Sequence, residues 1–211
     1  MAKSSSAKSS SKKPRSKKSA SKKSASKRSS AVKSSAATKN RTATETPFAV
    51  LFPDFEAEIA TTRRMLERVP NGKNDWRPHP RSRSLGELAG HVAQLPGFAL
   101  MMVTRDEFDA LAPRPGDAPL STSAERVQLF DQLSAQLLSL LKRMTWQQAD
   151  STWTLRLGEQ VAASAPRTSL IRSAFVTHTA HHRAQLGVYL RMLEVAVPWS
   201  YGGSADEQPT R

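Results

Sequence analysis

The sequence predicts an all-α protein, an antiparallel four-helix bundle with a small β-hairpin before the last helix and a disordered N-terminal tail. Three observations support this prediction. Four segments of about twenty residues repeat their apolar side chains at helical spacing. Connections rich in proline and glycine separate these segments. The first 45 residues consist almost entirely of Lys, Ser and Ala.

The tail, residues 1–45, differs in charge from the rest of the chain. The chain has 211 residues and a formal net charge of +14, and 14 of its 32 Lys and Arg residues lie within residues 1–41, which contain no Asp or Glu. The remaining 18 basic residues balance the 18 acidic ones. Because the tail has almost no large apolar side chains to bury, we expect it to be disordered and residues 46–211 to form one folded domain.

The first predicted helix covers residues 47–69, where apolar side chains recur at helical spacing. Pro53 is expected in its first turn or at a kink near its start, because proline lacks the backbone N–H that a helix interior needs. The run Pro70-Asn71-Gly72 is typical of a helix end and predicts where this helix stops.

The second predicted helix starts at Ser84 and continues to about residue 102. Ser84 and Glu87 have the spacing of a capping box, in which each side chain accepts a hydrogen bond from the other residue's backbone N–H. Pro96 predicts a kink within this helix. Residues 106–120 are rich in proline and are expected to form a long connection.

The third and fourth predicted helices cover residues 123–144 and 167–193, each with a continuous apolar stripe. Between them, residues 152–163 alternate apolar and polar side chains around a Gly-Glu turn, which predicts a β-hairpin. A hairpin of two strands is stable only when it packs against other structure, so we expect it to lie on the bundle.

Three histidines on apolar stripes form the candidate functional site. His178 and His182 lie four positions apart in the last predicted helix and therefore point the same way from adjacent turns. His91 lies on the stripe of the second predicted helix. Buried imidazoles without a partner are costly, and neutral imidazole is the commonest protein ligand for zinc, nickel and related ions. The sequence therefore predicts a three-histidine site for a divalent metal, with positions open for water or substrate.

Other polar residues are weaker candidates. His182 rather than its neighbour His181 is the expected ligand, because the apolar stripe continues on the side of His182. His79 is expected at the surface or near the start of a helix. Glu58 borders the first stripe and could reach the cavity as a catalytic base, although a solvated charge is the simpler interpretation. Each stripe histidine also has a structural alternative as a hydrogen-bonded core residue.

Residues 48–207 resemble the DinB family of DinB/YfiT-like four-helix bundles. The resemblance rests on the segments Trp76-Arg77-Pro78-His79, Ser84-Leu85-Gly86-Glu87-Leu88-Ala89-Gly90-His91 and His178-Thr179-Ala180-His181-His182-Arg183-Ala184-Gln185-Leu186. It implies a metal triad of His91, His178 and His182 that binds nickel or zinc, and a homodimer. Some members of the family resemble S-transferases that use a small-molecule thiol as a cofactor. The basic tail lies outside the family pattern.

Two classes of function remain open at this point. The first is a metal-dependent enzyme, a hydrolase or thiol-dependent S-transferase that acts on an unidentified small molecule. The second is a nucleic-acid-associated protein in which residues 1–41 bind DNA or RNA phosphates with little sequence preference, and the bundle serves as a dimerisation or interaction module. Each class has a simpler alternative. The tail could serve only to improve solubility instead of binding nucleic acid, and the bundle could hold a purely structural ion instead of a catalytic one.

Composition excludes several further classes. The chain contains no cysteine, so it has no disulfide, thiolate ligand or cysteine nucleophile. No apolar run reaches the ~18 residues of a membrane-spanning helix, and the basic N-terminus lacks the apolar segment of a secretory signal. We therefore expect a cytoplasmic protein without membrane contact, associated with the nucleoid if the tail binds DNA.

Overall fold

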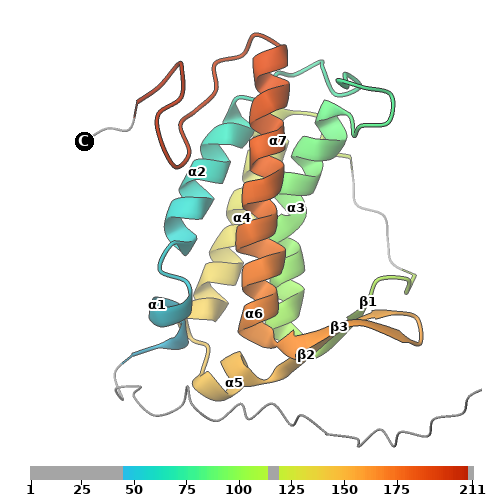
Figure 1. Ribbon diagram of the computed structural model, residues 1–211, viewed down its shortest axis with the longest axis vertical. Helices are drawn as coiled ribbons and strands as arrows, with labels where there is room; N and C mark the ends of the chain where they lie inside the picture. Colours follow the sequence, from blue (N-terminus) through green and yellow to red (C-terminus); the bar gives the residue numbers. More distant parts are fainter. Residues whose placement is uncertain (1–44, 114–118, 209–211) are drawn as a thin grey trace, which may run out of the picture. The chain divides into compact units, whose positions relative to one another are not determined.

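The computed structural model of this protein describes residues 45–113 and 119–208. This part of the chain is mostly helical, with a small three-stranded sheet at one end of the helices (Figure 1). The predicted tail, apart from its last residue, lies outside the described residues. None of the helices in the described ranges combines the length and the hydropathy that a membrane-spanning segment requires.

The domain begins with two helices, α1 (Pro47–Leu51) and α2 (Phe55–Glu67). The sequence predicts one helix here, with Pro53 in its first turn or at a kink, and the structure divides the segment at Pro53 because this residue has no N–H to donate to the preceding turn. Phe52 leaves the helical conformation with φ −134° and ψ 47°. Phe52 and Phe55, on the two sides of the break, are both buried, so the break brings both rings into the core.

The next two helices, α3 (Leu85–Thr104) and α4 (Ser123–Lys142), begin at the same end of the domain. Asn74 joins their starts, because its carbonyl accepts a hydrogen bond from Gly86 N–H (2.9 Å) and its Nδ2 donates to the carbonyl of Ser121 (2.8 Å). The two helices therefore run in the same direction (Figure 1). The prediction of a strictly antiparallel arrangement is wrong for this pair, because the connection between them is long enough to return along the length of the helices.

Both of these helices start with a capping box. Ser84 Oγ accepts a hydrogen bond from Glu87 N–H (3.2 Å), and Glu87 Oε2 accepts one from Ser84 N–H (2.6 Å). Thr122 and Glu125 form the same pair of bonds at the start of α4. Pro96 lies inside α3, which continues past it. The predicted start of the second helix is thus the observed one.

The last helical segment is continuous but not uniform. A short helix, α5 (Trp146–Asp150), leads from α4 toward the sheet. After the sheet, α6 (Arg167–Ile171) passes into a π-helical segment (Arg172–Thr177) and then into α7 (His178–Met192). A π-helical turn is wider than an α-helical one and is frequent at functional sites. Because this turn directly precedes α7, it sets the direction in which His178 points.

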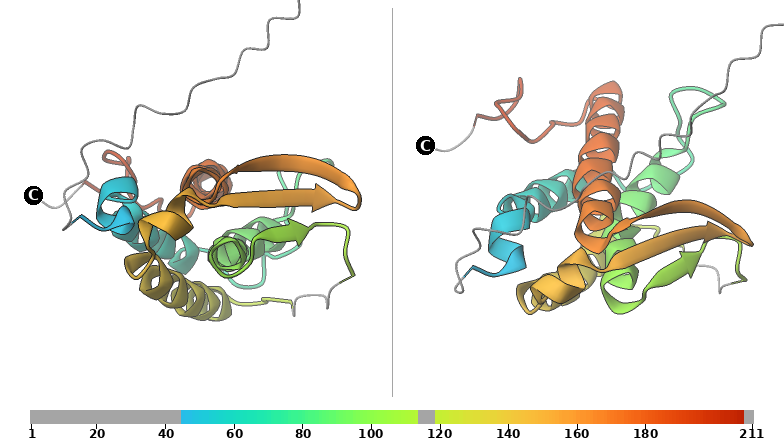
Figure 2. Two further views of the ribbon diagram at one scale, coloured as in Figure 1. Left: turned by 90° about the horizontal axis from the view of Figure 1, so that it is seen from below. Right: turned by 60° about the horizontal axis from the view of Figure 1, so that its bottom comes forward.

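The sheet contains the predicted hairpin and one unpredicted strand. Strands β2 (Thr152–Leu157) and β3 (Gln160–Pro166) are antiparallel, and β1 (Glu107–Asp109) pairs in parallel with β2. In this register Phe108 lies opposite Leu155. Figure 2 shows the strands extending to one side from the end of the helices. The sequence assigns β1 to a connection, because three residues are too few to show an alternating pattern.

The core consists of two apolar clusters at different levels of the helices. The cluster nearer the sheet includes Phe55, Leu95, Leu137, Trp153 and Phe175. The other cluster includes Met65, Val92, Phe130, Leu186 and Leu190. Between the two levels the long helices carry polar side chains that are buried or half-buried. This polar layer comprises Glu58, Thr62, His91, Ser134, His178, Thr179, His182 and Arg183.

Candidate metal centre

The candidate metal centre is the histidine triad, formed by His91 of α3 and by His178 and His182 of α7. With one ring nitrogen taken from each residue, the three nitrogens all lie within 4.8 Å of one another. His178 Nε2 and His182 Nε2 are 2.8 Å apart. The His91 ring centroid lies 5.3 Å from that of His178 and 4.6 Å from that of His182. The structure thus brings together the three histidines that the sequence singles out.

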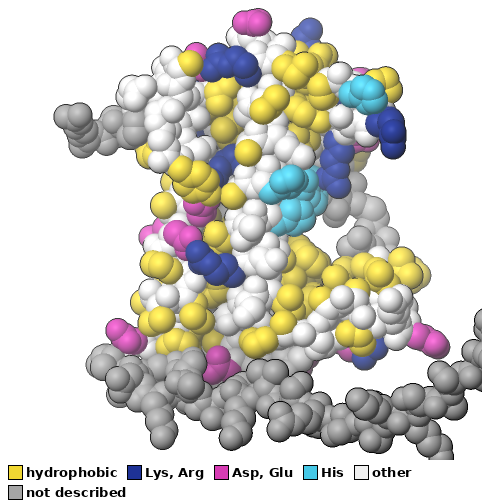
Figure 3. Space-filling view, in the orientation of Figure 1, with side chains coloured by type: hydrophobic (Ala, Val, Ile, Leu, Met, Phe, Trp, Pro, Cys, Tyr) yellow, Lys and Arg dark blue, Asp and Glu magenta, His cyan; other side chains and the backbone are white. Residues whose placement is uncertain are grey.

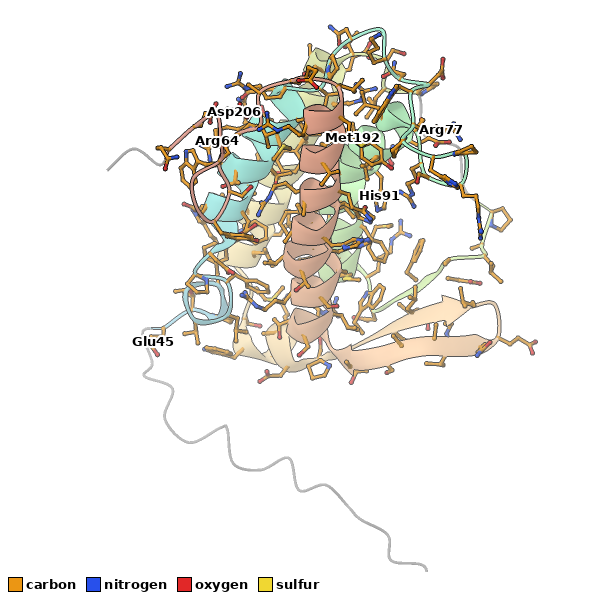
Figure 4. The ribbon with its side chains drawn as sticks, turned by 45° about the horizontal axis from the view of Figure 1, so that its top comes forward. Glu45, Arg64, Arg77, His91, Met192 and Asp206 are labelled. Carbon is orange, nitrogen blue, oxygen red and sulfur yellow. The ribbon has the colours of Figure 1, made fainter. Side chains whose placement is uncertain are left out.

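The triad lies at the surface of the helices and not deep in the core. All three histidines are half-buried, and histidine side chains form a patch beside α7 in the space-filling view (Figure 3). His91 projects from α3 toward α7 (Figure 4). On α7, His178 and His182 share one side because they are four residues apart. A small molecule could therefore approach the ring nitrogens from solvent.

Hydrogen bonds on the other side of the rings orient two of the triad nitrogens. His182 Nδ1 lies 2.7 Å from Gln185 Oε1. Because an amide oxygen only accepts, Nδ1 carries the proton and Nε2 presents its lone pair. The His178 ring forms a hydrogen bond to the backbone of Ala174, which belongs to the π-helical segment. Contacts of this kind fix the tautomer and the orientation of metal-binding histidines.

Among the described residues, one ring nitrogen of the triad has no hydrogen-bond partner. His91 Nε2 is buried and accepts or donates no hydrogen bond within the described part of the chain. A buried polar atom without a partner is costly. His182 Nε2 directs its lone pair at His178 Nε2, which repels it unless a proton or a cation lies between them. A single divalent cation would satisfy all three nitrogens, so the triad fits a metal ion.

The electrostatic environment keeps the triad neutral. Burial is the main cause that lowers the pKa of His91 to about 4, and the positive charge of Arg83 and the other two triad rings lower it further. Burial is also the first cause of the lowered pKa of His178 and of His182. Neutral imidazole is the form that binds metal, and at neutral pH no proton needs to be displaced from these rings.

The other two histidines lie outside the triad. His181 is exposed, as expected from its place at the edge of the apolar stripe. His79 is also exposed, in the loop before α3, and its Nδ1 accepts a hydrogen bond from the backbone N–H of Arg81 (3.1 Å). The chain therefore provides an exposed histidine, His181, directly beside the triad member His182.

Glu58 does not contact the triad. It lies on α2 and accepts hydrogen bonds from Arg183 Nη1 (2.7 Å) and from the Tyr201 hydroxyl (3.2 Å) through Oε2. Its side chain is only 8% exposed and that of Arg183 2%. The interpretation of Glu58 as a solvated charge is therefore wrong, and its role as a catalytic base stays a prediction. Sequence reasoning missed Arg183, although its spacing from the buried Leu186 and Leu190 places it on the buried side of α7.

Comparisons with known proteins agree with this description. A family model described as the DinB superfamily matches residues 54–186, a range that includes the whole histidine triad. The chain belongs to the DinB superfamily. This confirms the family that the sequence motifs indicate. A comparison of this DinB chain with curated proteins gives no match.

Two solved structures of DinB-like proteins are similar to this chain. One, from Bacillus subtilis, has a TM-score of 0.56 and 17% identity, and the match covers 75% of this chain and 99% of that one. The other, from Bacillus cereus, has a TM-score of 0.56 and 15% identity, with 72% of this chain and 95% of that one covered. At this level of identity the two structures support the DinB fold and carry no further argument about activity.

Proposed function

We propose that this member of the DinB superfamily is a metal-dependent enzyme whose histidine triad binds nickel or zinc. Its reaction class is hydrolysis or thiol-dependent S-transfer on a small molecule, with a small thiol as cosubstrate in the second case. The observation that carries the proposal is the convergence of three neutral, half-buried imidazoles, one of which has a buried nitrogen without a partner. We place the protein in the cytoplasm, as a homodimeric four-helix bundle formed by α2, α3, α4 and the segment from α6 to α7.

The chain's own residues prepare the site for such chemistry. A bound divalent ion would supply a Lewis acid that lowers the pKa of a coordinated water or thiol. Three protein ligands leave coordination positions open, which is typical of reactive metal sites. Gln185 holds the His182 ring through Nδ1, and the backbone of Ala174 holds the His178 ring. The triad therefore keeps its nitrogen atoms oriented before an ion or a substrate arrives.

Metal content of purified variants tests the proposal. We expect about one divalent ion per chain in the wild type, and loss of this ion in His178→Ala and in His182→Ala, because each variant keeps only two of the three imidazole ligands, one on α3 and one on α7. The matched control is His181→Ala, which removes an exposed neighbouring imidazole and is expected to retain the ion. Elemental analysis with native mass spectrometry measures all four proteins. Unchanged metal content in both triad variants would contradict the proposal.

A second candidate function rests on the separation of charge along the sequence. Of the 32 basic residues, 14 lie within residues 1–41, and no acidic residue accompanies them. We propose that this segment binds nucleic acid through phosphate contacts, and that binding weakens steeply as salt increases. Deletion of residues 1–41 is expected to abolish salt-sensitive retention on DNA, measured by filter binding at several salt concentrations. Equal retention by the truncated protein would rule this function out.

A further inference from the structure

The chain that follows α7 forms a pocket together with α2 and α7. It turns back beside these two helices (Figure 1), and in Figure 4 its residue Asp206 lies on the opposite side of α7 from His91. The pocket has a volume of about 420 Å³ and is lined by Met65 of α2, by one side of α7 that includes Arg183, and by residues 197–204. Small-molecule sites in proteins have volumes of this order. The pocket is therefore large enough for a ligand and is separate from the histidine triad.

Contacts with both helices hold the wall formed by residues 197–204. Arg64 Nη2 of α2 donates a hydrogen bond to the carbonyl of Trp199 (3.1 Å), and the Arg64 guanidinium lies over the Trp199 ring, 4.2 Å from its centroid. Just beyond the wall, Asp206 forms an ion pair with Arg191 of α7. The segment is thus tied to α2 at its middle and to α7 at its end.

Arg183 is a buried cation in the lining of this pocket, and one of its nitrogens is unused. Nη1 donates to Glu58 Oε2 (2.7 Å) and to the Thr62 hydroxyl (3.0 Å). Nη2 is buried and has no acceptor within the part of the chain that the structure describes. A buried donor without an acceptor is costly, and the side chain is only 2% exposed. An acceptor atom on a bound molecule would remove this cost.

Tyr201 covers the guanidinium of Arg183 and is itself mostly in solvent. Its ring centroid lies 5.1 Å from the guanidinium carbon, and its hydroxyl donates to Glu58 Oε2 (3.2 Å). The residue is nevertheless 75% exposed. Because so little of the ring is packed, it can turn away at small cost and open Nη2 to the pocket.

The lining favours a planar ring that carries an acceptor oxygen. The guanidinium of Arg183 already packs against an aromatic ring, that of Tyr201, and a ligand ring can take the same place. Trp199 supplies a second aromatic side chain to the lining. No carboxylate is among the described residues that line the pocket, so nothing there repels an oxygen lone pair. Since Glu58 already balances the charge of Arg183, the oxygen can be neutral.

We propose that this pocket is a second ligand site, for a small aromatic molecule whose acceptor oxygen binds Arg183 Nη2. The proposal does not depend on the metal-dependent function, because the pocket contains none of the triad histidines. Gly187 follows Arg183 by one helical turn and leaves room for the ring. A Cβ at this position would lie 3.6 Å from Val197 Cγ1 and 3.7 Å from Met65 Cε, so a larger side chain there would project into the pocket without a clash at its base.

Titration of the full-length protein with benzamide tests the proposal. The methionine methyl groups are labelled with ¹³C, and NMR follows Met65 in the pocket and Met101 in the groove between α3 and α4 as the control. Aniline is the matched probe, because it is a neutral ring of similar size without the oxygen. We expect benzamide to shift the Met65 signal and not that of Met101. Aniline should bind with a Kd about tenfold higher, the loss expected for one hydrogen bond to a charged group.

Three variants separate binding by Nη2 from an effect on folding. Arg183→Lys keeps a positive charge beside Glu58 without Nη2, so the Kd of benzamide should rise about tenfold while that of aniline stays unchanged. Gly187→Leu fills the pocket, favours the helix and leaves Arg183 intact, and should abolish binding of both probes. Ser169→Leu adds the same side chain at an exposed position of α6, outside the lining, and should bind both probes as the wild type does.

Three results would overturn the proposal. They are a Met65 signal that benzamide does not shift, a wild type that binds aniline as tightly as benzamide, and a Gly187→Leu variant with unchanged binding. An unchanged benzamide Kd in Arg183→Lys would equally rule out the role of Nη2. If Arg183→Lys does not fold, the comparison of the two probes on the wild type still decides whether the oxygen contributes.

Discussion

Replacing Glu58 with alanine is expected to lower the free energy of unfolding by about 3–5 kcal/mol. The substitution leaves the guanidinium of Arg183 buried without its counter-ion, at a position where the side chain is only 2% exposed. Arg183 Nη1 would keep the Thr62 hydroxyl (3.0 Å) as an acceptor, while Arg183 Nη2 already lacks one. Urea unfolding followed by circular dichroism measures the loss.

A matched acidic residue on the same helix provides the control. Glu56 pairs with Lys142 at 2.6 Å, but both side chains are more than half exposed, at 60% and 52%. Glu56→Ala should therefore cost less than about 1 kcal/mol, because exposed ion pairs contribute little. A Glu58→Ala variant no less stable than Glu56→Ala would contradict the prediction.

The double variant Glu58→Leu with Arg183→Met separates two contributions to stability. One is the net contribution of the ion pair, and the other is the cost of leaving one buried charge without its partner. Two apolar side chains of similar volume remove both buried charges together, and such replacements are often neutral or stabilising. We expect the double variant to be more stable than Glu58→Ala alone. If it were the least stable of the set, the ion pair itself would be the main contributor to stability at this place.

The features that the sequence predicts correctly are local ones. The capping box of Ser84 and Glu87 involves residues three positions apart, and the hydrogen bonds of α3 confirm it. The alternating pattern before the last helix likewise predicts a hairpin, which β2 and β3 form. Spacing along one helix also shows that His178 and His182 share a side of α7. In each case the information lies within a few residues.

The features that the sequence does not predict depend on contacts between distant segments. Glu58 and Arg183 are 125 residues apart. The sequence around Glu58 does not indicate that an arginine neutralises its charge, and the sequence around Arg183 does not indicate a carboxylate partner. The common direction of α3 and α4 is fixed by Asn74, a polar loop residue that bonds to the start of both helices. Strand β1 exists because β2 offers it a free edge. Helical spacing carries no information about any of these pairings.

The polar layer contains both the candidate metal centre and the buried ion pair, which therefore lie at the same level of the helices. On α7, His182 points toward α3 while the adjacent Arg183 points toward α2. Neighbouring residues on a helix differ in direction by about 100°, so one short segment serves two interfaces. The apolar clusters on either side of this layer supply the packing that holds both polar groups in place. Stability and metal binding should therefore be linked.

Saturating zinc or nickel is expected to stabilise the folded protein by about 4 kcal/mol when its concentration is 1,000 times the Kd. For a chain of this size that corresponds to an increase in Tm of roughly 8–16 °C. The increase should be absent in His178→Ala and His182→Ala and retained in His181→Ala, whose ring is exposed. Differential scanning calorimetry with and without metal measures it. An equal increase in the triad variants would show that the ion stabilises the protein from another site.

The metal-free protein should lose stability as the pH falls from about 6.5 to about 4, the ordinary and the folded-state pKa of His91. Above this window the imidazole is neutral in both states, and the pKa shift has no effect on stability. Within the window the unfolded chain binds a proton that the folded chain resists binding, so the unfolded state is favoured. The variant His91→Gln should lack this component of the pH dependence in urea unfolding. Because protons compete weakly for the triad, the metal-dependent increase in Tm should persist at about pH 5.5, and its disappearance there would contradict the neutral state of the three half-buried rings.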